Sequence, residues 1–587
     1  MKLIVKEFLS QLKESGELDR LLPDLLARMK IIPISRAQVG VRQNGVDVAA
    51  VGKDENGVKT LFLFVLKVGD LGRRDWDSGV NAVRTTLNQV KDSYWHSFVR
   101  PEHRGLPVKI VVCSTGGLKQ DVTQDFNGYV AGNQTDCVNY AFWSGDDLAA
   151  LIDKHLLDEY AIDPSERADL RRGIALVGSR DYDLRHAYRV LDALLLGSHD
   201  GSVRSTKAHR KKFIRKLRTA ALVLEIIFRW ANEEGNLLNA FKVGERCCLW
   251  AWEFIRVRDL FKYRPAMAAF WDIYQIHGRV CRAYYDKVGP YFLVRDGISV
   301  YAGENALVTD KVFEQIGVLA EIGLVQLQNA SGENGEVAAG NADAIAKVLV
   351  SLVKNNPSSG SPRYDGHAIE LSTAFTLLLG TGNHEAAKAW LDELANRVSY
   401  SLRTSKCFPI ATDSFDDLVA LEIGELTKEE VAKLKDLSTL VPTLMYWSVV
   451  FGYDELYCKL QSAQGSTFDG ICLQLWYADE ETESLVYRES AQYESGTTEA
   501  PIVFPAGVDE LIAGEKKKLD SKAIVGLDVF SAVRYGMFAI VMMACRHFRT
   551  PFPPQFWMPF IDASSRSPTS DQSDTTSDTP SAAGREF

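Results

Sequence analysis

The sequence lacks the spacings that mark several common kinds of functional site. Its nine cysteines include no CxxC pair, and its ten histidines show neither HxxxH nor HExxH spacing, so no zinc site is indicated. Neither GxxxxGKS/T nor GxGxxG occurs, which excludes nucleotide-binding loops of those two kinds. An odd number of scattered cysteines without a disulfide framework is typical of a reducing compartment.

Long apolar runs are also missing. The longest strongly apolar stretch near the C-terminus is Tyr535–Cys545, flanked by Arg534 and Arg546, and a membrane span needs roughly 20 residues. The first 18 residues are amphipathic and charged throughout, without the apolar core of a signal peptide. We therefore expect a cytoplasmic protein without a membrane partner.

The chain has no general excess of basic residues that would coat it for nucleic acid. Its net charge is −10, but the charge is uneven along the chain. Residues 1–155 carry 20 Lys and Arg against 19 Asp and Glu, whereas the remainder carries 47 against 58. The acidity therefore lies outside the N-terminal segment, which leaves that segment compatible with nucleic-acid binding.

The pattern of apolar residues changes along the 587-residue chain, which is long enough for three or four domains of about 150 residues each. The expected fold class is an α/β N-terminal domain followed by a mainly α-helical region. We predict the α/β domain at 1–158 and helical domains at 165–330 and 341–562. The Ser/Thr/Asp/Pro-rich segment 563–587 has too few apolar residues to fold and is predicted to be a disordered tail.

The first third mixes helical and strand periodicities. Apolar residues at helical spacing predict helices over about 18–29 and 80–94, and a last helix is expected to end at His155. The valine-rich stretch 36–52 predicts two short strands, and the turn at Asp54–Gly57 leads into the continuous apolar run Leu61–Leu66, which is typical of a buried strand. Further strands are predicted at 108–113 and 138–142.

Two polar residues stand beside these strands. Asp47 lies at the start of one strand and Lys67 at the end of the next, so pairing of the two as a hairpin would bring both to the same end of the sheet. Hydrolysis of a phosphodiester needs an anionic ligand for a divalent metal, and a cation that stabilises charge or orients the attacking water. An aspartate and a lysine in these positions could supply both.

Here the chain resembles the PD-(D/E)xK nucleases, and particularly their Mrr-like branch, over residues 1–155. Gly45-Val46-Asp47 is similar to that family's metal-binding strand, and Leu66-Lys67 followed by Val68-Gly69-Asp70 is similar to the end of its (D/E/Q)xK strand. The following helix, the strand Val108–Cys113 and the segment Phe142–Leu148 fit the family's order of elements. The resemblance covers about a quarter of the chain and implies a restriction-endonuclease-like fold.

The resemblance also implies a function. It is magnesium-dependent cleavage of DNA, with Asp47 as a metal ligand and Lys67 as the catalytic lysine. Asp70 is a candidate second ligand for Mg²⁺, and Arg73 and Arg74, which follow closely, are candidate contacts for DNA phosphates. Bacterial proteins of this layout often serve in defence against foreign DNA, with the helical part sensing, assembling into a homo-oligomer or binding a protein partner.

One position departs from the family pattern. Val65 stands two residues before Lys67, where the family carries Glu, Asp or Gln. Three interpretations stay open. In the first, the acid has moved onto a nearby helix; in the second, a residue just after the strand replaces it; in the third, the site is inactive and the protein is a nucleic-acid-binding module or a helical scaffold. The candidate replacements are Asp24, Gln89 and Asp92 on helices, and Asp70, Asp75 and Asp77 after the strand.

A dense basic run between Arg204 and Arg218 is the remaining candidate. On a helix, five of its side chains would share one face and could follow a phosphate backbone. Such a run is more often a solvated face or pairs with acidic neighbours, and we favour that interpretation.

Overall fold

The computed structural model describes residues 2–10, 12–35, 45–78, 81–155, 164–176, 184–197, 207–299, 305–330, 335–404 and 408–561. The chain divides into two compact units, Met1–Lys287 and Val288–Phe587. The predicted disordered tail, and the first of the two strands expected in 36–52, lie outside the described residues.

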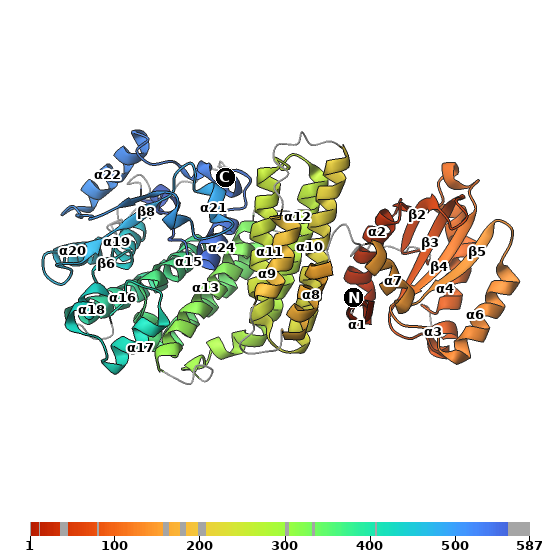
Figure 1. Cartoon of the computed structure of the whole chain (residues 1–587), viewed down its shortest axis with the longest axis horizontal. Helices are drawn as coiled ribbons and strands as arrows, with labels where there is room; N and C mark the ends of the chain where they lie inside the picture. The colour runs from red at the N-terminus through yellow and green to blue at the C-terminus, as the bar shows by residue number, and fades with distance from the viewer. Residues whose placement is uncertain are drawn as a thin grey trace, which may run out of the picture. The chain divides into compact units, whose positions relative to one another are not determined.

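The first unit contains a mixed five-stranded sheet in which the strands follow chain order (Figure 1). Its strands are β1 (Ile32–Pro33), β2 (Val48–Lys53), β3 (Lys59–Lys67), β4 (Val108–Ser114) and β5 (Val138–Trp143). β2 and β3 form an antiparallel hairpin, while β3, β4 and β5 run parallel. The strands predicted from the apolar runs are therefore confirmed to within a few residues at their ends.

Helices cover both faces of this sheet. On one face lie α1 (Lys2–Ser10), the π-helix η1 (Glu14–Leu18), α2 (Asp19–Arg28) and α7 (Gly145–His155). On the other lie α3 (Arg73–Asp77), α4 (Val83–Gln89) and α6 (Gln120–Asn133), whose apolar residues join those of the sheet in one hydrophobic cluster. Because β3 is buried along almost its whole length, its sequence is apolar at successive positions rather than alternating.

The helix predicted over 80–94 is present, but it is not a uniform α-helix. After α4 the chain forms a π-helix, η2 (Val90–Tyr94), and a short α5 (Trp95–Ser97). The apolar face identified from the sequence persists through this change, since Val83, Leu87, Val90 and Tyr94 are all buried. The wider turn adds a residue without moving that face away from the core.

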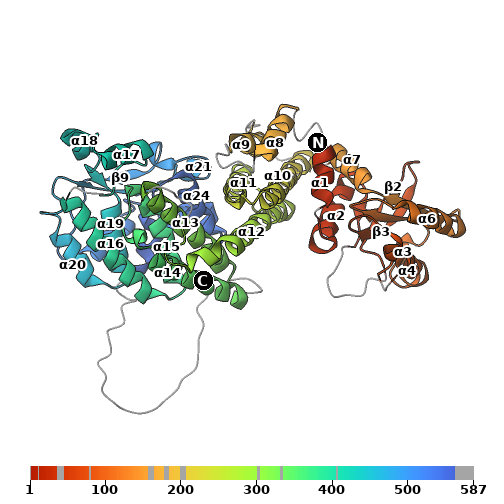
Figure 2. The same ribbon diagram turned by 90° about the horizontal axis from the view of Figure 1, so that it is seen from below.

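Long helices make up the rest of the first unit, and Figure 2 shows α10, α11 and α12 extending beside one another. The helices α9 and α11 both contact α10. No helix among the described residues is both long enough and apolar enough to cross a membrane. The helices are α8 (Pro164–Leu176), α9 (Arg185–Leu195), α10 (Lys207–Glu233), α11 (Leu237–Val257) and α12 (Arg264–Phe292).

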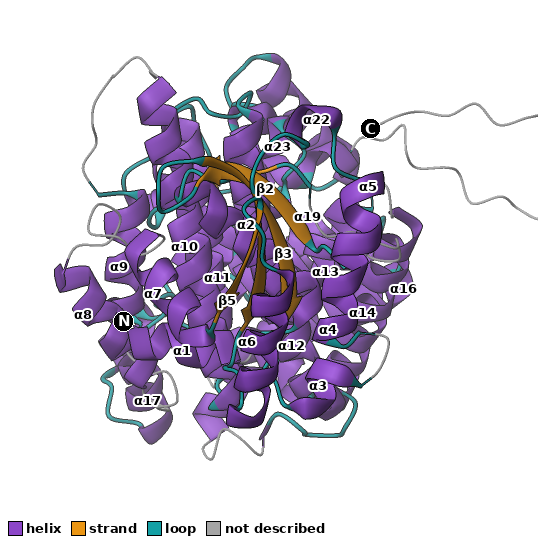
Figure 3. Cartoon of the chain, turned by 90° about the vertical axis from the view of Figure 1, so that its right-hand side faces the viewer, coloured by secondary structure: helices purple, strands orange, loops and turns teal. Residues whose placement is uncertain are grey.

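The described residues of the second unit are mostly helical, with two small two-stranded sheets. The predicted boundary between 330 and 341 falls inside this unit, where α13 and α14 pack against each other. Its main helices are α13 (Asn305–Asn329), α14 (Gly335–Asn355), α15 (Ala368–Gly380), α16 (His384–Thr404), α17 (Phe415–Ile423), α18 (Lys428–Lys433), α19 (Leu440–Val450), α20 (Asp454–Ser462), α21 (Glu483–Val486), α22 (Val508–Asp520), α23 (Ser531–Arg534) and α24 (Ala539–Phe548). The sheets pair β6 (Leu437–Ser438) with β7 (Cys472–Leu473), and β8 (Leu475–Tyr477) with β9 (Thr497–Glu499). Figure 3 shows, in orange, the strands β2, β3 and β5 of the first unit's larger sheet.

Candidate functional site

Asp47 lies just before β2, at the edge of the sheet where β3 ends. The glycine two residues earlier is required there, because Gly45 has a φ of 85° and a Cβ atom on it would come within 2.7 Å of the Thr86 carbonyl oxygen of α4. The backbone N–H of Asp47 donates to the Phe64 carbonyl at 2.9 Å, and the Leu66 N–H donates to Asp47 Oδ2 at 2.7 Å. These two bonds hold the carboxylate against the end of β3.

Lys67 ends β3 beside this carboxylate. Its side chain is only 15% exposed, so its ammonium group is held at the sheet edge and does not extend freely into solvent. Its Nζ lies 3.8 Å from Oε1 of Glu14, a residue for which the sequence pattern had offered no role. Asp47 and Lys67 are therefore brought together as expected, and a second carboxylate joins them from η1.

The three acids Glu14, Asp19 and Asp47 gather on this side of the sheet. The pKa of Asp47 is raised to about 6. Burial is the main cause and the negative charges of Glu14 and Asp19 add to it, while the Leu66 hydrogen bond and the positive charge of Lys67 lower the pKa. Among the charges that shift the pKa of Asp47, Lys67 is positive and Glu14 and Asp19 are negative. With Asp47 itself, the acids therefore outnumber the cation. An arrangement with excess negative charge favours a bound cation.

The π-helix η1 explains how Glu14 and Asp19 both act on Asp47. In an α-helix, residues five apart differ by about 140° around the axis. In η1 the Asp19 N–H donates to the Glu14 carbonyl, and the Leu18 N–H donates to the Lys13 carbonyl at 3.1 Å, which are the five-residue hydrogen bonds of a π-turn. That wider turn brings the two carboxylates nearer to one side of the helix.

The position where the family pattern carries an acid is part of the core. Val65 is fully buried in the hydrophobic cluster that the sheet forms with α3, α4 and α6, on the face of the sheet opposite η1. A carboxylate at that position would lose its hydration, at a cost of several kcal/mol for an unpaired charge of about this size. Glu14, an acid on a helix, lies beside Lys67, and it is none of the helical residues expected from the sequence. That an acid on a helix replaces the missing one stays a prediction.

Those expected residues have other contacts or positions. Asp24 on α2 forms an ion pair with Arg218 of α10 at 3.1 Å. Asp75 accepts the Gly72 N–H at 2.9 Å and so caps its own helix α3, and Asp77 pairs with Arg84 at 3.2 Å. Gln89 ends α4 and Asp92 lies exposed on η2, and neither is among the groups that shift the pKa of Asp47.

Asp70, the candidate second metal ligand, lies in the exposed loop after β3. Its Oδ1 accepts the Gly117 N–H at 2.9 Å, which ties this loop to the loop that follows β4. Asp70 is not among the charges that act on Asp47. The structure thus places Glu14, rather than Asp70, beside the Asp47–Lys67 pair, and ligation by Asp70 stays a prediction.

Arg73 and Arg74 begin α3, a few residues after Lys67, and both side chains are exposed. Lys119, which precedes α6, lies against Gly72 and adds a third basic side chain to this part of the surface. The basic run of α10 lies elsewhere, and its Arg218 pairs with an acid as we favoured. The cations nearest to Lys67 in the chain are therefore available to an anionic partner.

Comparison with known proteins adds no identity to this site. No family model, no curated protein and no solved structure matches the chain. Glu14 could not be found from spacing alone, since the π-turn that directs it is not visible as a periodicity. The available signal was the Ser15-Gly16 interruption between two helical stretches, with acids on both sides of it.

Proposed function

We propose that the N-terminal α/β part of this chain is a metal-dependent nuclease acting on DNA. The proposal depends chiefly on one observation, the Glu14 carboxylate 3.8 Å from Lys67 Nζ and close enough to Asp47 to raise its pKa. The sheet order, with an antiparallel hairpin continued by two parallel strands, supports a restriction-endonuclease-like fold. A role in defence against foreign DNA rests on the resemblance alone.

Two acids, Asp47 and Glu14, are available to hold a magnesium ion. Among the described residues, no group of three His, Cys, Asp or Glu is arranged to hold a metal. Mg²⁺ usually keeps several waters and is bound through only one or two carboxylates plus substrate phosphate, so Asp47 and Glu14 would suffice. When bound, the ion would polarise the phosphate and make a water more acidic.

The chain's own groups would then have separate roles. Asp47 and Glu14 would hold the ion, while the Lys67 ammonium would orient water or stabilise the charge that develops on the phosphate. Arg73, Arg74 and Lys119 would bind phosphates of the flanking backbone and so set the strand in the site. Cys113 lies near Asp47, but burial raises the pKa of its thiol well above the usual value, so it is not a competing nucleophile.

The test is cleavage of duplex DNA, single-stranded DNA and RNA by the full chain with Mg²⁺ or Mn²⁺. We expect Lys67→Ala to lower the rate at least about a thousandfold and Glu14→Gln about a hundredfold, because each removes a group that acts on the transition state. Asp70→Asn distinguishes the two candidates for the second acid and should retain activity. The exposed Asp136→Asn is a matched control far along the chain.

The result that contradicts this proposal is equally specific. If no nucleic acid is cleaved with either metal, and salt-sensitive DNA binding persists, the domain is an inactive binding module. If binding is absent as well, the helical-scaffold interpretation stands. Loss of activity in Asp70→Asn but not in Glu14→Gln would keep the nuclease and reject Glu14 as the second acid.

A further inference from the structure

The π-helix that carries Glu14 is also held from its other side by the long helices. The Glu17 carboxylate makes two contacts that hold it, one within η1 and one with α10. Its Oε2 accepts the backbone N–H of Lys13 at 2.8 Å, which fixes the residue next to Glu14, and its Oε1 forms an ion pair with Arg229 of α10. One carboxylate therefore joins the start of η1 directly to α10.

This ion pair belongs to a larger, largely buried cluster. Arg229 Nε also lies 3.4 Å from Glu225 Oε1 on the same helix, and Glu225 pairs with Arg279 of α12. The Arg229, Glu17 and Glu225 side chains are 16%, 17% and 11% exposed. Charges so far removed from water interact more strongly than surface pairs, so this cluster can hold a preferred geometry.

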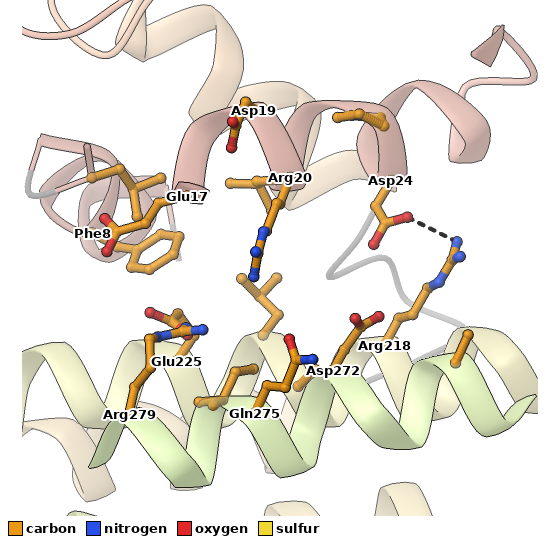
Figure 4. A pocket seen from close by; sticks show the side chains of 17 residues that line it. Phe8, Glu17, Asp19, Arg20, Asp24, Arg218, Glu225, Asp272, Gln275 and Arg279 are labelled. Atoms are coloured by element: carbon orange, nitrogen blue, oxygen red, sulfur yellow. Dashed lines mark hydrogen bonds and ion pairs between the residues drawn. The ribbon is translucent and has the colours of Figure 1, made fainter. Parts of the chain in front are cut away.

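Beside the cluster, α2 faces α10 and α12 across a pocket of about 510 Å³. Figure 4 shows Arg20 extending from α2 into the pocket, with Glu225 and Arg279 at one end and the Asp24–Arg218 pair at the other. Hydrophobic packing is thus interrupted between these helices. Ion pairs at the two ends of the pocket connect the facing helices across it.

A π-turn is rarely stable by itself, and such turns are frequent at functional sites where surrounding contacts maintain them. If η1 relaxed to an α-helix, the extra residue would be lost from the turn. Each residue of an α-helix turns by about 100°, so Glu14 would rotate away from the side that faces Asp47 and Lys67. The contacts of Glu17 at Lys13 and Arg229 oppose that rotation.

We propose that Arg229 is a positioning residue that, through Glu17, holds η1 in its π-turn and so keeps Glu14 at the Asp47–Lys67 site. The role assigned to Glu14 at that site rests on the proposed nuclease function. The long helices would then control the site, because any movement of α10 relative to η1 reaches Glu14 through one ion pair. This gives the helical part a regulatory purpose in addition to that of a scaffold.

The test compares the full-length Arg229→Gln and Glu17→Gln variants with the wild type. Arg397→Gln is the matched control, since Arg397 pairs with Glu393 at 2.5 Å within α16 of the second unit. Three quantities are measured. They are hydrogen–deuterium exchange of residues 12–19 in the metal-free protein, Mn²⁺ affinity by calorimetric titration, and cleavage of DNA. Both variants should exchange faster in this segment, bind Mn²⁺ about tenfold more weakly and retain DNA affinity.

The double variant Glu17→Gln with Arg229→Gln should be no worse than either single variant, because both remove the same connection. Arg229→Lys, which keeps the charge, should restore most of the protection and affinity. The proposal is overturned if exchange in 12–19 and Mn²⁺ affinity are the same in Arg229→Gln and in Arg397→Gln.

The two proposals fail in different ways. A wild type that cleaves DNA and is unaffected by Arg229→Gln keeps the nuclease and rejects the positioning role. A wild type without cleavage or Mn²⁺ binding rejects the nuclease, and the exchange of residues 12–19 still decides whether Arg229 holds η1. Faster exchange of this segment in Arg229→Gln than in the wild type supports the role of Arg229 in holding η1, and unchanged exchange overturns that role.

Discussion

Asp47 in the first unit and Asp365 in the second are aspartates whose pKa burial raises to about 6 in both cases. The number of hydrogen bonds that each carboxylate accepts differs between them. Asp365 accepts hydrogen bonds from Ser438 Oγ at 2.6 Å, Thr439 N–H at 2.6 Å and Leu440 N–H at 3.1 Å, at the start of α19. Asp47 accepts one bond from Leu66 and otherwise faces two carboxylates and a lysine.

The difference shows that a raised pKa does not by itself identify a functional group. Asp365 has a full set of donors and satisfies N–H groups that the first turn of a helix would otherwise leave unpaired. Asp47 has few donors and shares its surroundings with charges of its own sign, an arrangement that a structural role does not require. The partners of each carboxylate, rather than its burial, separate the helix cap from the candidate site.

The largest expected effect on stability comes from the helix-capping aspartate, Asp365. Asp365→Ala should lower the free energy of unfolding by about 3 kcal/mol, because it leaves three donors at the start of α19 without this acceptor, two of them on the buried residues Ser438 and Leu440. Denaturant unfolding of the full chain measures this. Asp509→Ala, an exposed acid in the first turn of α22, is the control and should cost less than about 1 kcal/mol. Equal effects of the two changes would mean that Asp365 is not a cap.

The pH dependence of cleavage should report Asp47. At Mg²⁺ concentrations well below saturation the rate reports the metal-free enzyme, in which a carboxyl group with a pKa of about 6 is largely protonated below that pH. The rate should then rise about tenfold per pH unit up to pH 6 and level off above it. Asp19→Asn removes a charge that raises this pKa and should move the inflection to lower pH. An inflection near pH 4 in the wild type would show that Asp47 titrates like an exposed aspartate and would contradict this assignment.

Asp47→Asn should raise the free energy of unfolding at pH 7, whereas Asp365→Ala should lower it. Between pH 4 and pH 6 the folded protein binds more protons at Asp47 than the unfolded chain does, so its contribution to stability falls as pH rises through that window. Asp47→Asn keeps an acceptor for Leu66 and removes the charge. It should raise the free energy of unfolding at pH 7 by about 1–2 kcal/mol, after allowance for partial exposure, and change little at pH 4. A loss of stability at pH 7 would contradict the prediction.

The smallest expected effect concerns the basic surface at the start of α3. Replacing Arg73 and Arg74 together by Gln should weaken DNA binding about threefold to tenfold and lower the salt dependence by roughly two phosphate contacts. Lys53 and Lys59 pair at the opposite end of the β2–β3 hairpin, and their replacement by Gln is the matched control. Binding and its salt slope are measured by fluorescence anisotropy. The same slope for both double variants would place the DNA elsewhere.

Much of the N-terminal architecture follows from the sequence itself. The apolar run 61–66 is typical of a strand buried on both faces, and the turn at Asp54–Gly57 favours an antiparallel partner for it. Hairpin geometry then brings the residues at the open end together, so the sequence alone predicts that Asp47 and Lys67 lie close to each other. Helical periodicity likewise predicted the helical character of the remaining chain, though not its division into units.

The second acid was decided by tertiary structure alone. Asp24 has helical spacing and suitable chemistry, but α10 offers it Arg218, whereas Glu14 reaches Lys67 only because η1 adopts a π-turn. That turn depends on contacts between segments more than 200 residues apart in the chain, such as Glu17 with Arg229. Local sequence determines strands and helices through periodicity and turn chemistry, while the direction in which a helix presents its carboxylate depends on what packs against it.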